Sequence, residues 1–380
     1  MAAHIGNNMV GYKMKTKISK IMLAIFAMSI LLSVPASADV EKVDFTEGGH
    51  LETDFGVNFM AEWWYLNGKA TLVSSDGEIK DAGFFAVLAH QESPLFRGYS
   101  QLLTFHGLYF NKSEPVFNYV ETFVPRDNVS QFISLHTPYV YYRYPDGLKQ
   151  IKGSPLGGYN LEYASVQTNV DMDLLFQTNV KKTVYHANSP LNFTTYEHSY
   201  GTLHGSITIN GKRYTVTRAE GYMDHMIPVS RGPWAMDMHG WNWFEVTTKN
   251  YQVVGYAMRG LDDGYENYSY KHLTLLDKQN GKVLAKYSTK DITISETGWV
   301  NESAFNRKRP ETVVFSTPNL KVALNAESVI DFNKSSPSNL AGFVDFMAFQ
   351  PKKASIKYKG DTEQGSAFFE YLVSDIGVVH

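Results

Sequence analysis

Two short segments hold the residues of this chain whose types could perform acid–base chemistry. The first is Glu62-Trp63-Trp64-Tyr65, and the second runs from Gly221-Tyr222-Met223-Asp224-His225 to Gly240-Trp241-Asn242-Trp243-Phe244-Glu245. The residues named here include four of the six tryptophans of the chain. Because aromatic rings enclose apolar ligands while carboxyl groups and imidazoles transfer protons, this combination predicts an apolar pocket beside a proton-handling group.

Strand geometry predicts which side chains of the first segment share a face. Successive residues of a strand point to opposite sides, so Trp63 and Tyr65 lie on one face, and Glu62 and Trp64 on the other. A structural alternative stays open at this point. In that alternative the tryptophans fill the end of a barrel, and Glu62 accepts a hydrogen bond from a backbone amide or pairs with an arginine.

The second segment places an acid on an aromatic face. Glu245 shares a strand face with Trp241 and Trp243. Burial among indoles would raise the pKa of such a carboxyl group and keep it protonated near neutral pH. A protonated carboxylic acid can protonate an alkene or polarise a carbonyl group.

Asp224 and His225 form a carboxylate–imidazole dipeptide. In a strand their side chains face opposite ways, whereas in a loop both could line one opening as an acid–base pair. The structural alternative is a turn aspartate followed by a histidine with a packing role. Asp224, His225, Asp237 and His239 together offer N and O ligands for zinc or iron, but they lack the H-x-x-x-H and H-E-x-x-H spacings, and we predict no metal.

The elements that must position these residues are strands. The segments 203–210 and 212–217 alternate apolar and polar residues around Asn210-Gly211, which is typical of a two-residue hairpin turn. Three further pairs of the same type punctuate the chain, namely Asp76-Gly77, Asp146-Gly147 and Asn280-Gly281. Such turns predict antiparallel meanders.

About ten strand candidates lie on each side of residue 230, and helical periodicity is scarce. Closing a sheet into a barrel removes its edges, so we predict an all-β chain with two tandem antiparallel β-barrel domains, 39–230 and 231–380. No G-x-G-x-x-G, P-loop or G-x-S-x-G follows a strand, which excludes the common nucleotide-binding and α/β-hydrolase sites. We therefore expect no cofactor.

The first 38 residues have the composition of a secretory signal peptide. Four lysines precede the apolar run 21–32, and Ala36-Ser37-Ala38 is an A-x-A cleavage site. The sequence thus predicts an exported protein that is periplasmic, cell-surface or secreted. Removing 1–38 takes away lysines but no acidic residue, so the charge becomes more negative than the −3 of the full chain, and nucleic acid is not expected as a partner. The chain has no cysteine, which excludes disulfides.

At these segments the chain resembles the hydroxyneurosporene synthase family, also called carotenoid 1,2-hydratases, and their lipocalin-like relatives. The resemblance is carried by Glu62-Trp63-Trp64-Tyr65, by 221–225, by 240–244 and by the following strand to Arg259, and it covers about 45 to 375. It implies two tandem lipocalin-like domains around an apolar region and a long apolar ligand such as an isoprenoid. It also implies addition of water across a terminal isoprenoid double bond without a redox cofactor.

The resemblance also implies roles for individual residues. Asp224 and His225 would handle the proton, and aromatic faces would stabilise a tertiary carbocation before water captures it. The chain departs from the family at Ile227 and Asn242, where Trp and Asp are common. The predicted ligand-binding residues are Glu62, Trp63, Trp64, Tyr65, Trp241, Trp243, Glu245 and Arg259.

Other functions are compatible with the same sequence. One is a non-catalytic extracytoplasmic lipid carrier, and another is an accessory component of an ABC-type export system that passes on an apolar cargo, with a membrane as the neighbouring surface. A catalyst of cyclisation would need only a shaped pocket. A buried acid converging with His225 on an apolar cavity would favour the hydratase, and a cavity without such an acid would favour the carrier.

Overall fold

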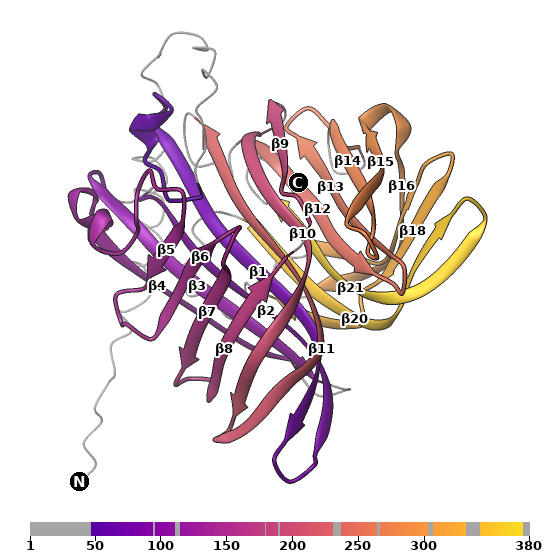
Figure 1. Ribbon diagram of the computed structural model, residues 1–380. Coiled ribbons are helices and arrows are strands. Elements are labelled where there is room, and N and C mark those ends of the chain that lie inside the picture. The colour runs from indigo at the N-terminus through magenta and orange to yellow at the C-terminus, as the bar shows by residue number, and fades with distance from the viewer. Residues whose placement is uncertain are drawn as a thin grey trace, which may run out of the picture. The chain divides into compact units, whose positions relative to one another are not determined.

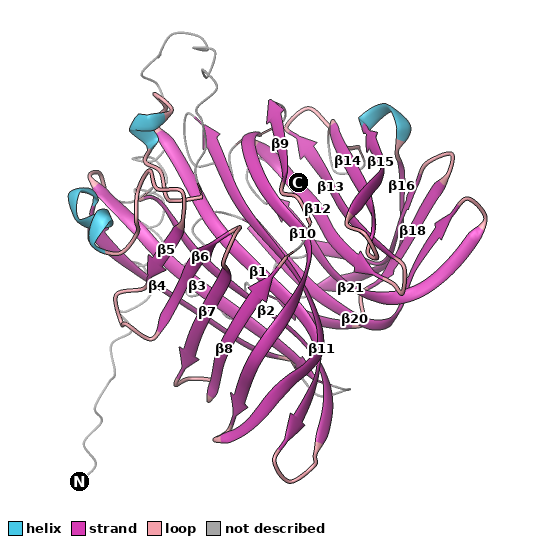
Figure 2. Cartoon of the chain, viewed as in Figure 1, coloured by secondary structure: helices cyan, strands magenta, loops and turns pink. Residues whose placement is uncertain are grey.

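Alternating apolar and polar residues fold into long antiparallel strands (Figures 1 and 2). The computed structural model describes residues 47–93, 96–110, 115–178, 180–188, 191–230, 237–263, 267–302, 307–331 and 343–374. The predicted signal peptide, 1–38, lies outside the described residues. Within them the helical elements are short 3-10 turns, η1 (Glu52–Asp54), η2 (Arg126–Gln131) and η4 (Thr289–Asp291). No helix in these ranges is long and apolar enough to cross a membrane.

The first sheet is built from the indigo to magenta part of the chain in Figure 1. Its order is β4-β3-β2-β1-β11-β10-β8-β7-β6-β5, and β9 pairs with β10. Its strands are β1 (Phe59–Ser74), β2 (Ile79–Glu92), β3 (Tyr99–Phe110), β4 (Val116–Pro125), β5 (Val140–Arg143), β6 (Lys149–Ser154), β7 (Gly158–Ser165), β8 (Val170–Gln177), β9 (Thr183–Asn188), β10 (Asn192–Ile209) and β11 (Lys212–Ser230).

The second sheet uses the orange to yellow strands that lie beside the first (Figure 1). Its order is β15-β14-β13-β12-β21-β20-β18-β17-β16, and β19 pairs with β20. Its strands are β12 (Met238–Thr247), β13 (Tyr251–Gly260), β14 (Tyr270–Asp277), β15 (Lys282–Ser288), β16 (Thr293–Glu302), β17 (Arg307–Ser316), β18 (Leu320–Asn325), β19 (Ser328–Asp331), β20 (Phe343–Tyr358) and β21 (Asp361–Ser374). Each sheet curls, and all pairings between its named strands are antiparallel, which confirms the all-β prediction.

The four predicted turns each join two neighbouring strands. Asn210 and Gly211 have φ angles of 51° and 78° between β10 and β11, as a type I′ hairpin requires. The other three turns carry a glycine with positive φ at the same place in the β1–β2, β5–β6 and β14–β15 hairpins. The turn chemistry therefore fixes the register of these pairs.

Central strands bury both of their faces. In β1 the even-numbered side chains, such as Trp64 and Leu66, belong to the core of the first sheet, while Tyr65 belongs to a cluster between the sheets. In β12, Phe244 lies in the core of the second sheet and Trp243 in the cluster between the sheets. Strands buried on two faces read as near-continuous apolar runs, which explains the density of aromatics in both motifs.

Gly240 shapes the start of β12. Its φ is 138°, and a Cβ at this position would lie 1.9 Å from the carbonyl oxygen of Leu372 on β21. The β12–β13 register shifts between Met238 and Gly240, so β12 is irregular at this point. A glycine here lets β12 pass close to β21 just before Trp241 and Trp243 turn toward the first sheet.

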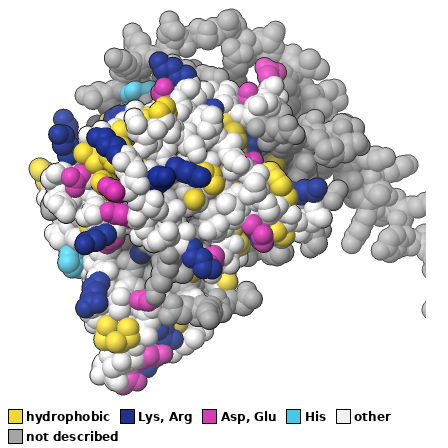
Figure 3. Space-filling model, turned by 90° about the vertical axis from the view of Figure 1, so that its right-hand side faces the viewer, with side chains coloured by type: hydrophobic (Ala, Val, Ile, Leu, Met, Phe, Trp, Pro, Cys, Tyr) yellow, Lys and Arg dark blue, Asp and Glu magenta, His cyan; other side chains and the backbone are white. Residues whose placement is uncertain are grey.

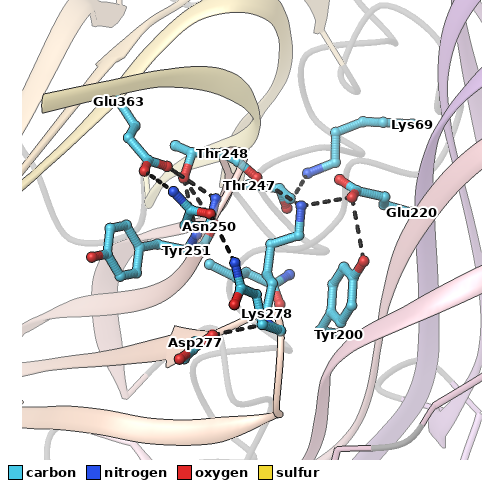
Figure 4. A network of polar contacts seen from close by, with 12 residues as sticks. Lys69, Tyr200, Glu220, Thr247, Thr248, Asn250, Tyr251, Asp277, Lys278 and Glu363 are labelled. Carbon is cyan, nitrogen blue, oxygen red and sulfur yellow. Dashed lines mark hydrogen bonds and ion pairs between the residues drawn. The ribbon is translucent and has the colours of Figure 1, made fainter.

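Charged side chains also link the two sheets (Figure 4). Lys69 on β1 donates to Glu245 Oε2 on β12 at 2.5 Å and to Thr247 Oγ1 at 2.9 Å. Lys278, which follows β14, donates to Glu220 Oε1 on β11 at 2.6 Å. The Glu245 side chain is 1% exposed, so its charge depends on Lys69 for compensation.

Replacing Lys69 by methionine is therefore expected to destabilise the protein. The buried carboxylate of Glu245 would keep only neutral partners, and breaking a buried ion pair from one side costs about 3–5 kcal/mol. Urea unfolding followed by tryptophan fluorescence measures this loss. In the control K69M/E245M both charges are absent, and most of the stability should return. Equal stability of K69M and the wild type would show that the pair is not needed.

Candidate functional site

A pocket opens between the two sheets, on the faces that β1, β11, β12, β13 and β21 turn toward each other. It encloses about 330 Å³ of empty space, including its open mouth. Its wall is mostly aromatic and thioether, with two carboxyl side chains. The lining residues are Trp63, Tyr65, Asp224, Met226, Trp241, Trp243, Tyr256, Met258 and Glu370.

The aromatic wall is assembled from both sheets. The ring of Trp63 on β1 lies 6.3 Å from that of Trp241 on β12. Tyr65 meets Trp243 edge to face with centroids 5.1 Å apart. These are the separations at which aromatic pairs attract each other. Two segments far apart in sequence thus form one wall.

Asp224 is the buried acid of this pocket. Its residue is 4% exposed. The hydroxyl of Tyr222 donates to Oδ2 at 2.8 Å, and that of Tyr256 donates to the same oxygen at 3.3 Å. Oδ1 is buried and has no hydrogen-bond partner among the described residues. Because Oδ2 is occupied as an acceptor, a proton on Asp224 belongs on Oδ1.

Burial raises the pKa of Asp224 to about 7, the charge of Glu370 adds to the rise, and the hydrogen bonds from Tyr222 and Tyr256 oppose it. Glu197 is the register partner of Asp224 on β10, and burial raises its pKa to about 8. Asp224 is thus a carboxylic acid that can gain or lose its proton near neutral pH. The titratable groups that face it are Tyr65, Glu197, Tyr222, Tyr256 and Glu370.

His225 lies on the opposite face of β11 and does not converge with Asp224. Its Nε2 is 2.6 Å from Glu62 Oε1 inside the first sheet. His50 Nδ1 is 2.9 Å from the same oxygen, and His90 Nε2 is 2.6 Å from Glu62 Oε2. The backbone N–H of His50 also donates to Oε2, at 2.9 Å. Trp64 stacks on His225 with centroids 4.8 Å apart. We call Glu62, His50, His90 and His225 the Glu62 cluster.

The Glu62 cluster holds a buried ion pair. Burial would raise the pKa of Glu62, but the charge of His50 and the hydrogen bonds from His225, His50 and His90 lower it well below its usual value. Burial would lower the pKa of His50, but Glu62 raises it, and the net shift is upward. Glu62 is therefore a carboxylate, and His50 is the histidine that carries the balancing charge.

The same cluster contains the side chains that could hold a metal among the described residues. One ligand atom each of His50, Glu62 and His225 lies within 4.8 Å of the others. The nitrogen–oxygen distances are those of hydrogen bonds, whereas two ligands about 2.0–2.1 Å from one tetrahedral ion lie about 3.3 Å apart. The set considered from the sequence is not assembled, because His239 contacts the carbonyl oxygen of Leu261.

The remaining predicted residues lie away from the pocket. Glu245 pairs with Lys69. Arg259 lies inside the second sheet, where it contacts Tyr268 and sits 3.0 Å from Glu296. The pocket therefore unites five predicted residues, Trp63, Tyr65, Asp224, Trp241 and Trp243, and leaves out Glu62, Trp64, His225, Glu245 and Arg259.

Sequence reasoning missed several residues of both sites. His90 could have been found, because pairing residues outward from the Asp76-Gly77 turn, one on each strand, places His90 opposite Glu62. Tyr256 faces Trp243 across β12 and β13, and Glu370 faces the same tryptophan from β21. The pairing of Glu370 with Trp243 joins distant segments of the chain, so no local sequence pattern predicts it.

The chain was compared with known proteins. No protein-family model and no curated protein sequence matches it. A putative AttH from Nitrosomonas europaea aligns with 89% of this chain and 98% of its own, at 14% identity and a TM-score of 0.60. Kievitone hydratase from Nectria haematococca aligns with 83% of this chain and 90% of its own, at 12% identity and a TM-score of 0.57. CghA aligns with 91% of this chain and 96% of its own, at 9% identity and a TM-score of 0.61.

At these identities the similarity shows a shared fold. The prediction of two tandem lipocalin-like β-barrel domains is confirmed, because proteins of this fold align along nearly their whole length. The solved structures of this fold include a named hydratase. Membership of the hydroxyneurosporene synthase family stays a prediction.

Proposed function

We propose that this protein is a cofactor-independent hydratase in which Asp224 protonates a double bond at the end of an apolar, isoprenoid-like ligand. One observation carries the proposal: a carboxyl group that titrates near neutral pH presents an oxygen without a hydrogen-bond partner among the described residues, in the wall of an aromatic pocket. The fold shared with kievitone hydratase supports it. The predicted signal peptide supports an extracytoplasmic site of action.

The steps need only Asp224 and water. Oδ1 gives its proton to one carbon of the double bond, and the positive charge develops on the tertiary carbon. The faces of Trp63, Trp241 and Trp243 stabilise that charge through their quadrupoles. A water molecule bonds to the cationic carbon, and the proton it releases returns to Asp224. The hydroxyls of Tyr222 and Tyr256 hold Oδ2 and thereby orient Oδ1 throughout.

The pocket is sized for the end of a long ligand. Its 330 Å³ of empty space includes the open mouth, so the enclosed part is much smaller than this figure. A long isoprenoid would therefore place its terminal unit beside Asp224 and leave the remainder outside. A reaction at a terminal double bond suits this arrangement.

The two departures from the family lie away from the pocket. Ile227 is two residues from His225 and so shares its face of β11, turned into the first sheet. Asn242 donates to Tyr268 and to Glu296 inside the second sheet. Neither change removes a group from the pocket wall.

Isotope incorporation tests the reaction. The purified protein is incubated with farnesol, a short acyclic isoprenoid, in water enriched in ¹⁸O. We expect a tertiary alcohol that carries one ¹⁸O, formed only with folded protein. The carrier function has its own support, since His225 does not converge with Asp224. If native mass spectrometry and extraction find a bound lipid, and no lipid or isoprenoid acquires ¹⁸O, the protein is a carrier.

The rate of hydration is expected to fall above pH 7. Only the protonated form of Asp224 can deliver a proton, and its pKa is about 7. The rate should be constant well below this value and decrease about tenfold per pH unit well above it. A pH–rate profile between pH 5 and 9 measures this, and a rate that rises through pH 7 would contradict the acid role.

The export-accessory function predicts an exposed apolar patch at a domain edge. On the face shown in Figure 3, side chains of both charge types are interspersed, and hydrophobic side chains lie in small groups between them. The largest exposures among described apolar residues, at Leu156 and Val166, fall in or near turns of the first sheet. This surface gives the accessory function no specific support.

A further inference from the structure

We propose that the inter-sheet pocket also binds a compact organic cation, namely a tertiary or quaternary ammonium group. This inference rests on the proposed function only for the pocket that both use. Of the nine described residues that line it, five are aromatic, two are methionines and two are acids, and none of these nine is lysine, arginine or histidine. A carboxyl-bearing aromatic box of this kind is the typical recognition site for methylated ammonium ions.

The rings present faces and edges from several directions. Trp63 and Trp241 are tilted by 40° to each other, and Trp243 stands at 73° to Tyr65. Tyr256 lies at 60° to Trp243, with centroids 6.5 Å apart. Because these planes differ, the rings enclose a space from more than one side. This arrangement suits a rounded group such as a methylated ammonium, which has methyl groups on all sides.

The carboxyl group of Asp224, whose Oδ1 has no hydrogen-bond partner among the described residues, makes the pocket electrically selective. Asp224 comes from the first sheet and Glu370 from the second. Lys69 lies on the same face of β1 as Trp63 and Tyr65, but it pairs with Glu245 and does not line the pocket. When Asp224 is ionised, a neutral guest gains nothing from its charge, whereas a cation gains from that carboxylate and from the aromatic faces.

Cation binding is therefore coupled to the proton on Asp224. A cation favours the ionised carboxylate, so binding releases the proton, and affinity should rise as pH increases through about 7. Among the described residues, the titratable groups that face Asp224 are Tyr65, Glu197, Tyr222, Tyr256 and Glu370. Burial raises the pKa of the three tyrosines well above 10, so they stay neutral over this range, whereas the pKa of Glu197 is raised to about 8.

Choline and its neutral carbon isostere, 3,3-dimethylbutan-1-ol, test the inference. Calorimetry and tryptophan fluorescence measure both affinities on the full chain at pH 6 and pH 8. We expect choline to bind at least about tenfold more tightly than the isostere at pH 8, with a smaller preference at pH 6. Equal affinities, or no binding of choline by folded protein, would overturn the inference.

Variants locate the site. Trp243→Phe keeps the apolar volume but weakens the ring quadrupole, and it should reduce the preference for choline about three- to tenfold. Trp299→Phe, at a tryptophan that is 46% exposed on β16, should leave it unchanged. Asp224→Asn should remove most of the pH dependence and leave only the part that Glu197 contributes. These experiments measure binding alone. If choline binds as expected but the isotope experiment finds no hydration, the proposed function is rejected and this inference stands.

Discussion

Asp224→Asn is expected to lower the rate of hydration about 10²–10⁴-fold, the contribution typical of a positioned general acid. Asparagine has nearly the same shape, and its amide oxygen can still accept the hydrogen bond that Tyr222 now donates to Oδ2. The amide cannot deliver a proton to an alkene. The loss should therefore appear in kcat with a small change in KM, because the aromatic walls that bind the ligand remain.

Asp173→Asn is the matched control. Asp173 is an exposed aspartate on β8 of the same sheet, and its replacement removes the same charge away from the pocket. Its rate should equal that of the wild type, and thermal unfolding should show that all three proteins are folded. If D224N and D173N hydrate the ligand at the same rate, Asp224 is not the acid.

The fold could be predicted because its signals are local. Asn210-Gly211 requires a tight turn, and the alternation around it assigns each side chain to a face. The same alternation separates Trp63 from Trp64 correctly. It holds within each hairpin, where turn and register depend on a few neighbouring residues.

The site could be predicted only in part, because it depends on which faces meet. Alternation separates Asp224 from His225, but it does not say which of the two turns toward the second sheet. The partner of His225 is Glu62 on the neighbouring strand β1, and Glu370 reaches the pocket from the last strand. These contacts follow from packing between distant segments, which leaves no local trace.

The Glu62 cluster should control stability. Glu62→Gln is expected to destabilise the protein by about 3–5 kcal/mol, the usual cost of removing one partner of a buried ion pair. The Glu62 side chain is 0% exposed and accepts hydrogen bonds from histidines of three segments. A glutamine has one acceptor oxygen, and its amino group would face a ring or backbone N–H that also donates. The charge on His50 would lose its counterion.

The pH dependence distinguishes this ion pair from simple packing. The pKa of Glu62 is lowered below 4.5, so its contribution is present above that value and is lost as pH falls through the folded pKa. The pKa of His50 is raised above 6.5, so its contribution is complete below that value and is lost as pH rises through the folded pKa. The difference between wild type and E62Q in urea unfolding should be widest between about pH 4.5 and 6.5.

Glu162→Gln provides the comparison for this window. Glu162 on β7 is 43% exposed and pairs with the exposed Lys152 at 3.1 Å, and such surface pairs contribute about 0–1 kcal/mol. Its loss should be small at every pH. If E62Q costs no more than E162Q, the ion pair between Glu62 and His50 does not stabilise the fold, and the cluster is held by packing alone. A large loss confined to the acidic window would instead show that Glu62 stabilises the first sheet through its ion pair with His50, while Trp63 and Tyr65 of the same segment line the pocket on the opposite face.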